Sequence, residues 1–233
     1  IIFEKQKIKL SYTKNKFDII GSGNIFLQDN LDNINYKIIN NEGNYLFNIN
    51  LNINDNPFIF DFINFEKDIK TNLELKIEGT LKKDILGFDQ ITLLENKNVL
   101  SIKNLKLSND YRIEEIEKIQ LDYKDTTKRK NQLKLTQNNK NYIIVGDSFN
   151  ADKLITQLLK SKKDNKKNWF IKNFDLKIDI KKVYLDQNNE INNLQGTMSL
   201  IDNEITELNL ESEFLNNQKI TFSMTEKGFI WIK

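Results

Sequence analysis

Carboxylates are the side chains of this sequence whose spacing raises the question of acid–base chemistry. The 233 residues include no histidine and no cysteine, which excludes Ser-His-Asp and Cys-His nucleophile systems, disulfides and Cys/His metal sites. Two carboxylate groups remain, Glu114/Glu115/Glu117 and Glu211/Glu213. The second group alternates with apolar residues, which predicts the wet face of a strand and no burial of the kind that acid–base catalysis exploits. We therefore expect a protein that is not an enzyme and holds no metal or cofactor.

Two further motifs have ordinary structural interpretations. In Gly21-Ser22-Gly23, the only Gly-x-Gly, Phe26 stands where a dinucleotide fingerprint requires glycine, and the residues that follow favour a strand. We expect a turn or bulge there. A lysine tract could meet anionic head groups, but an aspartate and asparagines interrupt it, which favours a solvated linker. The tract contains Lys160, Lys162, Lys163, Lys166 and Lys167.

The overall charge argues against a nucleic-acid partner. The chain carries 35 Lys and Arg against 33 Asp and Glu, a net charge of +2. A dedicated nucleic-acid binder would concentrate a basic excess on one face. We therefore expect no nucleic acid among the partners.

The elements that must position these side chains are strands. Apolar and polar residues alternate over 73–78, 174–181, 208–214 and 220–225, the pattern of a strand with one apolar and one wet face. Short turns rich in Asn, Asp and Gly separate the patterns, as at 40–44, 186–190, 201–204 and 216–218. Connections this short join antiparallel neighbours. We predict a mainly β fold, a long antiparallel meander, and a strand rather than a helix over 113–123.

One short helix is expected near residues 150–161. Leu154, Ile155, Leu158 and Leu159 form one apolar stripe at helical spacing. Asn150 is a suitable N-cap for this helix. The helix and a charged linker, residues 148–168, would separate a first meander (1–147) from a second (169–233) within one segment of a larger β domain. A sheet of this length must curl, split into a sandwich or close. A β-sandwich and a curved, partly open sheet with an apolar groove need the same alternation, so periodicity does not separate them; without further information we favour the ordinary sandwich core.

The order of elements over 142–233 resembles a known family. A strand leads into Gly146-Asp147-Ser148-Phe149-Asn150-Ala151 and a Leu-rich helix, and Asp/Lys-alternating and Leu-rich strands follow. This order is similar to that of the AsmA-like proteins of Gram-negative envelopes, in particular their YhdP-like branch. Gly146, Asp147, Ala151 and Leu154 carry most of the likeness. The chain begins without a leader or membrane helix, and we interpret it as a piece of a longer protein.

The resemblance implies a non-enzymatic periplasmic segment that carries phospholipid along an apolar β groove between the inner and outer membranes and supports outer-membrane integrity. It also implies an inner-membrane anchor helix, and membrane contact, outside this segment. The expected partners are phospholipid acyl chains and other envelope proteins. The alternative is a structural or protein-binding β-sandwich module of the envelope. The groove-lining residues would be Phe174, Leu176, Ile178, Ile180, Leu194, Met198, Leu200, Leu208, Leu210, Phe214, Ile220, Phe222 and Met224.

Overall fold

The fold is mainly β, as the alternation predicts. The structure, a computed structural model, describes residues 1–83, 85–160, 169–216, 218–225 and 228–232. Strands account for 73% of the residues and helix for 4%. The lysine tract beyond Lys160 lies outside the described residues, so its interpretation as a linker stays a prediction. The chain forms two compact units, the first comprising 1–59 and 66–116 and the second 60–65 and 117–233. The helix expected to divide the chain lies within the second unit.

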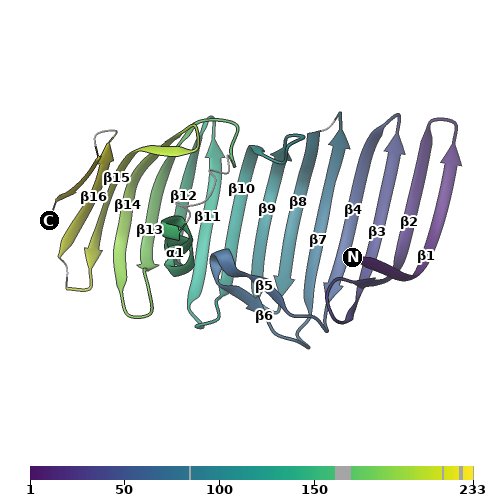
Figure 1. Cartoon of the computed structure of the whole chain (residues 1–233), viewed down its shortest axis with the longest axis horizontal. Coiled ribbons are helices and arrows are strands. Elements are labelled where there is room, and N and C mark those ends of the chain that lie inside the picture. The colour runs from purple at the N-terminus through teal and green to yellow at the C-terminus, as the bar shows by residue number, and fades with distance from the viewer. Residues whose placement is uncertain (84, 161–168, 217, 226–227, 233) are drawn as a thin grey trace. The chain divides into compact units, whose positions relative to one another are not determined.

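Unit 1 contains an antiparallel meander (Figure 1). Each strand pairs with the next in the order β1-β2-β3-β4-β7-β8-β9. The predicted hairpin at 40–44 is confirmed, because β3 and β4 pair from Asn41↔Asn44 outward around Glu42-Gly43. The strands are β1 (Ile2–Thr13), β2 (Lys16–Phe26), β3 (Leu31–Asn41), β4 (Asn44–Ile53), β7 (Leu73–Lys82), β8 (Ile85–Glu95) and β9 (Asn98–Leu107). The short strands β5 (Phe58–Phe60) and β6 (Phe65–Lys67) form a separate pair.

The strands of unit 2 also lie in a single layer, with one α-helix among the described residues of this unit. Its strands follow the order β10 to β17 without a break. Residues 113–123 form a strand, as predicted, and the helix lies where the apolar stripe predicts it. The elements are β10 (Ile113–Lys124), β11 (Lys130–Asn138), β12 (Asn141–Asn150), α1 (Asp152–Lys160), β13 (Phe174–Tyr184), β14 (Glu190–Ile201), β15 (Glu204–Phe214), β16 (Lys219–Thr225) and β17 (Gly228–Ile232), with the short 3₁₀ helix η1 (Asp61–Ile63) also in this unit.

One strand pair departs from the expected antiparallel pattern. β12 and β13 are parallel, with Ile144 opposite Ile178 and Phe149 opposite Val183. A parallel return needs a crossover of a dozen or more residues, and α1 with the segment after it provides that crossover. The helix is therefore the connection of a strand-helix-strand unit rather than an interruption between two meanders.

Of the two alternatives predicted for Gly21-Ser22-Gly23, a turn is wrong, whereas a register shift of the bulge type does occur opposite Gly23. Both glycines lie inside β2, which pairs with β3 without a register shift. The irregularity is on the other neighbour, because β1 shifts register between Glu4 and Lys7, opposite Gly23. A Cβ on Gly23 would come within 2.5 Å of the Gln6 side chain. Glycine leaves the space into which Gln6 folds to donate to the Asn24 carbonyl at 2.7 Å, so the bulge belongs to β1.

A buried lysine anchors the loop between β4 and β5 in unit 1. Lys67 is 1% exposed, and its ammonium donates to the backbone carbonyls of Asn54 at 2.9 Å and Asn56 at 2.6 Å. Asp32, also 1% exposed, accepts from the Asn54 N–H and the Asn56 amide. Burial lowers the pKa of Lys67, and the nearby Asp32 carboxylate opposes that shift. A cation and an anion thus hold opposite sides of one loop.

Substitution of Lys67 by methionine tests this anchor through its pH dependence. A lysine whose pKa is lower in the folded than in the unfolded state stabilises the fold increasingly as pH rises toward its ordinary value of 10.5. The difference in unfolding free energy between wild type and Lys67→Met should therefore grow as the pH of urea titrations is raised toward 10.5. Lys37→Met, an exposed position on β3, serves as the control. Equal pH slopes for wild type and Lys67→Met would contradict a buried, desolvated ammonium.

Candidate functional site

The structure aligns most of the predicted apolar residues of β13–β16 in cross-strand rows. Leu176 pairs with Met198, which pairs with Leu208, which pairs with Met224. A second row runs from Ile178 through Gly196 and Leu210 to Phe222. Because the register places these residues directly opposite one another, they lie on one face of the sheet. Shorter rows contain Phe174 with Leu200, Ile180 with Leu194, Phe214 with Ile191, and Ile220 with Ser212.

Exposure divides these thirteen residues into three classes. Leu176 and Ile180 are buried, at 8% and 6% exposure, so they would not contact a ligand directly. Phe214 is exposed at 37%, near the end of β15. The other ten are half-buried, which places an apolar surface at the boundary with solvent. These ten are Phe174, Ile178, Leu194, Met198, Leu200, Leu208, Leu210, Ile220, Phe222 and Met224.

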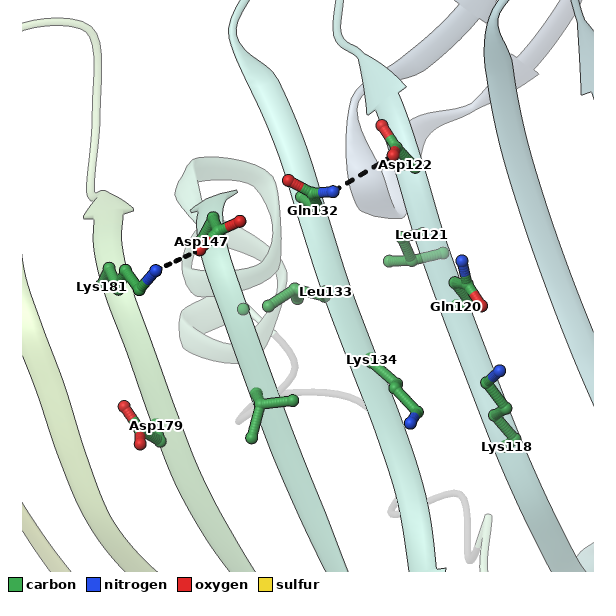
Figure 2. A pocket seen from close by; sticks show the side chains of 12 residues that line it. Lys118, Gln120, Leu121, Asp122, Gln132, Leu133, Lys134, Asp147, Asp179 and Lys181 are labelled. Carbon is green, nitrogen blue, oxygen red and sulfur yellow. Dashed lines mark hydrogen bonds and ion pairs between the residues drawn. The ribbon is translucent and has the colours of Figure 1, made fainter.

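The helix α1 and the charged side chains of β13 lie on different sides of the sheet. In Figure 2, Asp179 and Lys181 of β13 are on the near side, and the helix lies behind β12. Leu176 and Ile180 alternate with these charged residues and therefore face the side on which the helix lies. Leu154 of the helix is half-buried, as expected for its apolar stripe. On this side of the sheet Leu176 and Ile180 are buried, whereas Phe174, Ile178 and the apolar residues of β14–β16 are more exposed.

The four residues that carry the family resemblance have local structural roles. A Cβ on Gly146 would come within 2.6 Å of the Gln132 carbonyl, where β12 shifts register against β11. Asp147 forms an ion pair with Lys181 at 2.7 Å. Ala151 is buried, donates its N–H to Tyr184 O, and accepts from Ile155 N at the start of the helix. These residues shape the end of β12 and the entry into α1.

A buried polar cluster lies at the same place, and sequence reasoning missed most of it. Asp125, Asn131 and Asn150 are 5%, 0% and 2% exposed. One Asp125 carboxylate oxygen accepts from the Asn150 amide at 2.7 Å and the Asn131 amide at 3.4 Å. The Asn150 N–H donates to Asn131 Oδ1 at 2.7 Å, and Asn150 Oδ1 accepts from Asp152 N at 3.2 Å. The predicted N-cap position is one residue off, because Ala151 accepts the first helical bond and Asn150 precedes it, bonding to the first helical residue, Asp152. Asn150 also bonds to the turn after β10 and to β11.

The other Asp125 oxygen organises that turn. It accepts from the N–H groups of Thr127 and Arg129, both at 2.9 Å, and from the Thr127 hydroxyl at 2.8 Å. Arg129 in turn reaches the loop between β13 and β14, donating to the Asp186 and Gln187 carbonyls at 2.9 and 2.7 Å. Its guanidinium lies 4.4 Å from the Tyr184 ring centroid. Asp125 followed by two threonines is a turn signal in the sequence, but no one-dimensional pattern indicates these partners.

On the face of the sheet away from α1, the strands β10–β13 carry a shallow charged hollow of about 430 Å³ (Figure 2). Its carboxylates have partners: Lys181 holds Asp147, while Lys130 at 3.2 Å and the Gln132 amide at 3.2 Å hold Asp122. The hydrogen bond from Lys181 lowers the pKa of Asp147. A carboxylate held ionised in this way is unsuited to donate a proton as a general acid. Lys118, Lys134 and Asp179 also line this hollow, so that its lining contains as many lysines as aspartates.

A second hollow of about 560 Å³ lies over β13–β16, and its lining combines polar side chains with Ile178 and Leu210. Its lining includes Gln195, Thr197, Asn209, Glu211 and Thr221. Thr197 pairs with Asn209, and Gln195 pairs with Glu211, which pairs with Thr221. These residues alternate with the apolar rows and therefore form the reverse, wet face of the same strands.

The carboxylate groups weighed in the sequence do not form an acid–base pair in the described structure. Glu115 forms an ion pair with Lys106 at 2.6 Å in unit 1. Glu211 is exposed on the wet face of β15, as expected, and Glu213 accepts from the Asn193 amide at 3.1 Å. In the described part of the chain, no group of three or more Asp or Glu residues is placed to bind a metal ion.

Comparison with family models, with curated proteins and with solved structures found no match. No helix among the described residues has the length and apolar character needed to cross a membrane. The geometry of the two faces is therefore the basis on which a function is proposed.

Asn150→Leu tests the buried cluster. Leucine has a similar size but leaves Asp125 with only the long Asn131 contact on that oxygen and removes the bond that Asp152 N donates at the start of α1. Because a buried carboxylate loses a donor, we expect a loss of about 2–3 kcal/mol in unfolding free energy. Urea unfolding followed by circular dichroism measures the loss. Asn209→Leu, at an exposed site on β15, should change the stability by less than about 0.5 kcal/mol, and equal losses would refute the special role of Asn150.

Proposed function

We propose that this chain is a non-enzymatic, AsmA-like segment of the YhdP-like type, which holds phospholipid acyl chains on the apolar face of β14–β16. The carrying observation is the pair of apolar rows, Met198–Leu208–Met224 and Gly196–Leu210–Phe222. All of their side chains are half-exposed. A soluble sheet normally covers such a face with a second layer, and a row of apolar side chains left at the solvent boundary favours an apolar ligand.

The chemistry of lipid solvation matches the side chains available. Acyl chains need apolar contact area rather than directional bonds, and each buried CH₂ contributes about 0.8 kcal/mol. Leucine, methionine and phenylalanine supply that area, and methionine adapts to irregular shapes. The charged residues of the reverse face are engaged in ion pairs such as Lys181–Asp147, which suits a solvated outer surface rather than a catalytic one.

The β-sandwich module that is favoured without further information has less support. The described residues form one extended sheet and the small β5–β6 pair. A sandwich core requires two extended apolar faces that cover one another. The half-exposure of Leu208, Leu210 and Phe222 therefore supports an open sheet that binds an apolar ligand.

Under this proposal the segment acts in the periplasm and moves phospholipid between the two membranes in support of the outer membrane. Its anchoring and its contact with the membranes involve other parts of the protein, and other envelope proteins are its partners. This setting rests on the resemblance of residues 142–233, whereas the ligand class rests on the apolar rows themselves.

Leu210→Asp separates a ligand-binding face from a structural core. A carboxylate at this half-exposed position remains near water in the free protein but faces the acyl chain in the complex, where its desolvation is costly. We expect at least a tenfold loss of bound phospholipid, measured by extraction and mass spectrometry, with little change in the circular dichroism spectrum.

Two matched variants complete the lipid experiment. Asn209→Asp places the same carboxylate on the wet face of the same strand and should retain wild-type lipid. Leu176→Asp places it at a buried position and should unfold unit 2. A wild-type protein that yields no lipid from cells and takes up none from phospholipid vesicles would overturn the proposal.

A further inference from the structure

One end of the strands in unit 2 carries several exposed apolar side chains. Trp169 and Ile171, which precede β13, are 61% and 39% exposed. Ile201 and Ile205, on either side of the turn between β14 and β15, are 44% and 40% exposed. Apolar side chains exposed together on a surface mark sites of interaction with proteins or membranes.

Hydrogen bonds hold these two segments side by side. The Phe170 N–H donates to Asn203 Oδ1 at 2.8 Å, and the Asn203 amide donates to the Phe170 carbonyl at 2.9 Å. The Asp202 N–H donates to Asn173 Oδ1 at 2.9 Å. These bonds join the segment before β13 to the turn after β14, so their exposed apolar residues share one rim of the sheet. This rim, called the Trp169 rim below, consists of Trp169, Ile171, Ile201 and Ile205.

The Trp169 rim borders the apolar rows of the sheet. Leu200 pairs with Phe174 on β13 and with Ile205 on β15, so one row of the apolar face includes a residue of the rim. Phe170 packs edge-to-face on Phe174, with ring centroids 4.9 Å apart. The apolar surface that we propose to hold acyl chains therefore continues to this end of the strands.

We propose that the Trp169 rim docks on the surface of a phospholipid bilayer, where lipid passes between the membrane and the apolar face of β14–β16. A tryptophan ring has an apolar body and a polar N–H, and it is therefore favoured at membrane–water interfaces. The isoleucines beside it enter the boundary of the acyl region. This inference rests on the proposed function, because it names the place where the same ligand enters or leaves.

The charges of the two segments determine how they interact with the bilayer. Residues 169–173 contain Lys172, and residues 201–205 contain Asp202 and Glu204. These residues do not form the basic cluster that attraction to anionic lipids requires. The rim therefore binds by insertion of apolar side chains, and its binding to zwitterionic vesicles should persist at about 0.5 M salt.

Flotation of the full chain with phosphatidylcholine vesicles tests the docking site. Wild type should float with the vesicles, and Trp169→Ser and Ile201→Asp should each weaken this association about tenfold or more. The first variant removes the interfacial ring, and the second places a carboxylate at the acyl boundary. Both variants should retain the circular dichroism spectrum of wild type, since both positions are exposed.

Leu215→Asp is the matched control for Ile201→Asp. Leu215 is 68% exposed and follows the last residue of β15, at the opposite end of that strand from Ile205. The same change from an apolar side chain to a carboxylate should alter the vesicle association by less than about threefold. An effect equal to that of Ile201→Asp would overturn the assignment of docking to the Trp169 rim.

Tryptophan fluorescence reports the contact directly. In the variant Trp231→Phe, Trp169 is the only tryptophan, so vesicles that contain brominated acyl chains should quench its emission. Emission that is unchanged by an excess of such vesicles would overturn the proposal.

Two lipid measurements separate this inference from the proposed function. Purified Trp169→Ser and Ile201→Asp should still yield phospholipid on extraction and mass spectrometry, but should exchange it with vesicles about fivefold more slowly or less. A wild type that yields phospholipid but does not float would overturn the docking site and leave the proposed function standing. A wild type that floats but neither yields nor takes up phospholipid would support docking and overturn the proposed function.

Discussion

The buried carboxylate of Asp125 is the interaction on which the architecture of unit 2 depends. It bonds to the turn after β10 through one oxygen and to Asn131 and Asn150 through the other. Those partners belong to β11 and to the end of β12, the point at which the chain leaves the sheet for α1. An ionised group without such donors would be very costly to bury, so the carboxylate restricts how β10, β11 and β12 can pair.

That restriction determines where the parallel pair forms and which apolar residues are covered. With the end of β12 held by Asn150, the crossover through α1 returns the chain beside β12 as β13. Arg129 bonds to the far end of β13 through the Asp186 and Gln187 carbonyls. Leu176 and Ile180 on β13 are buried, while Leu208 and Leu210 on β15 remain half-exposed.

Unit 1 contains a comparable buried network of hydrogen bonds, which is centred on a lysine rather than on an aspartate. Lys67 is buried against backbone carbonyls, and Asp32 accepts from the same loop at Asn54 and Asn56. In both units a single-layered sheet has little hydrophobic core to define its loops. Buried hydrogen bonds to charged groups are strong and directional, and they fix loop positions that apolar contacts alone would leave loose.

The sequence by itself determined the strands, the short turns and the single helix, because side-chain alternation and helical spacing are local properties of the chain. It also determined that β13–β16 have one apolar and one polar face. A period of two places the side chains of Leu208 and Leu210 on one face of any sheet and those of Asn209 and Glu211 on the other. Only the tertiary structure decided that β12 and β13 are parallel, that the bulge near Gly23 lies on β1, and that Leu176 is covered while Leu210 is half-exposed. Those outcomes depend on hydrogen bonds between residues far apart in the chain, such as Asp125 with Asn150. The local periodicity of side chains does not indicate such partners.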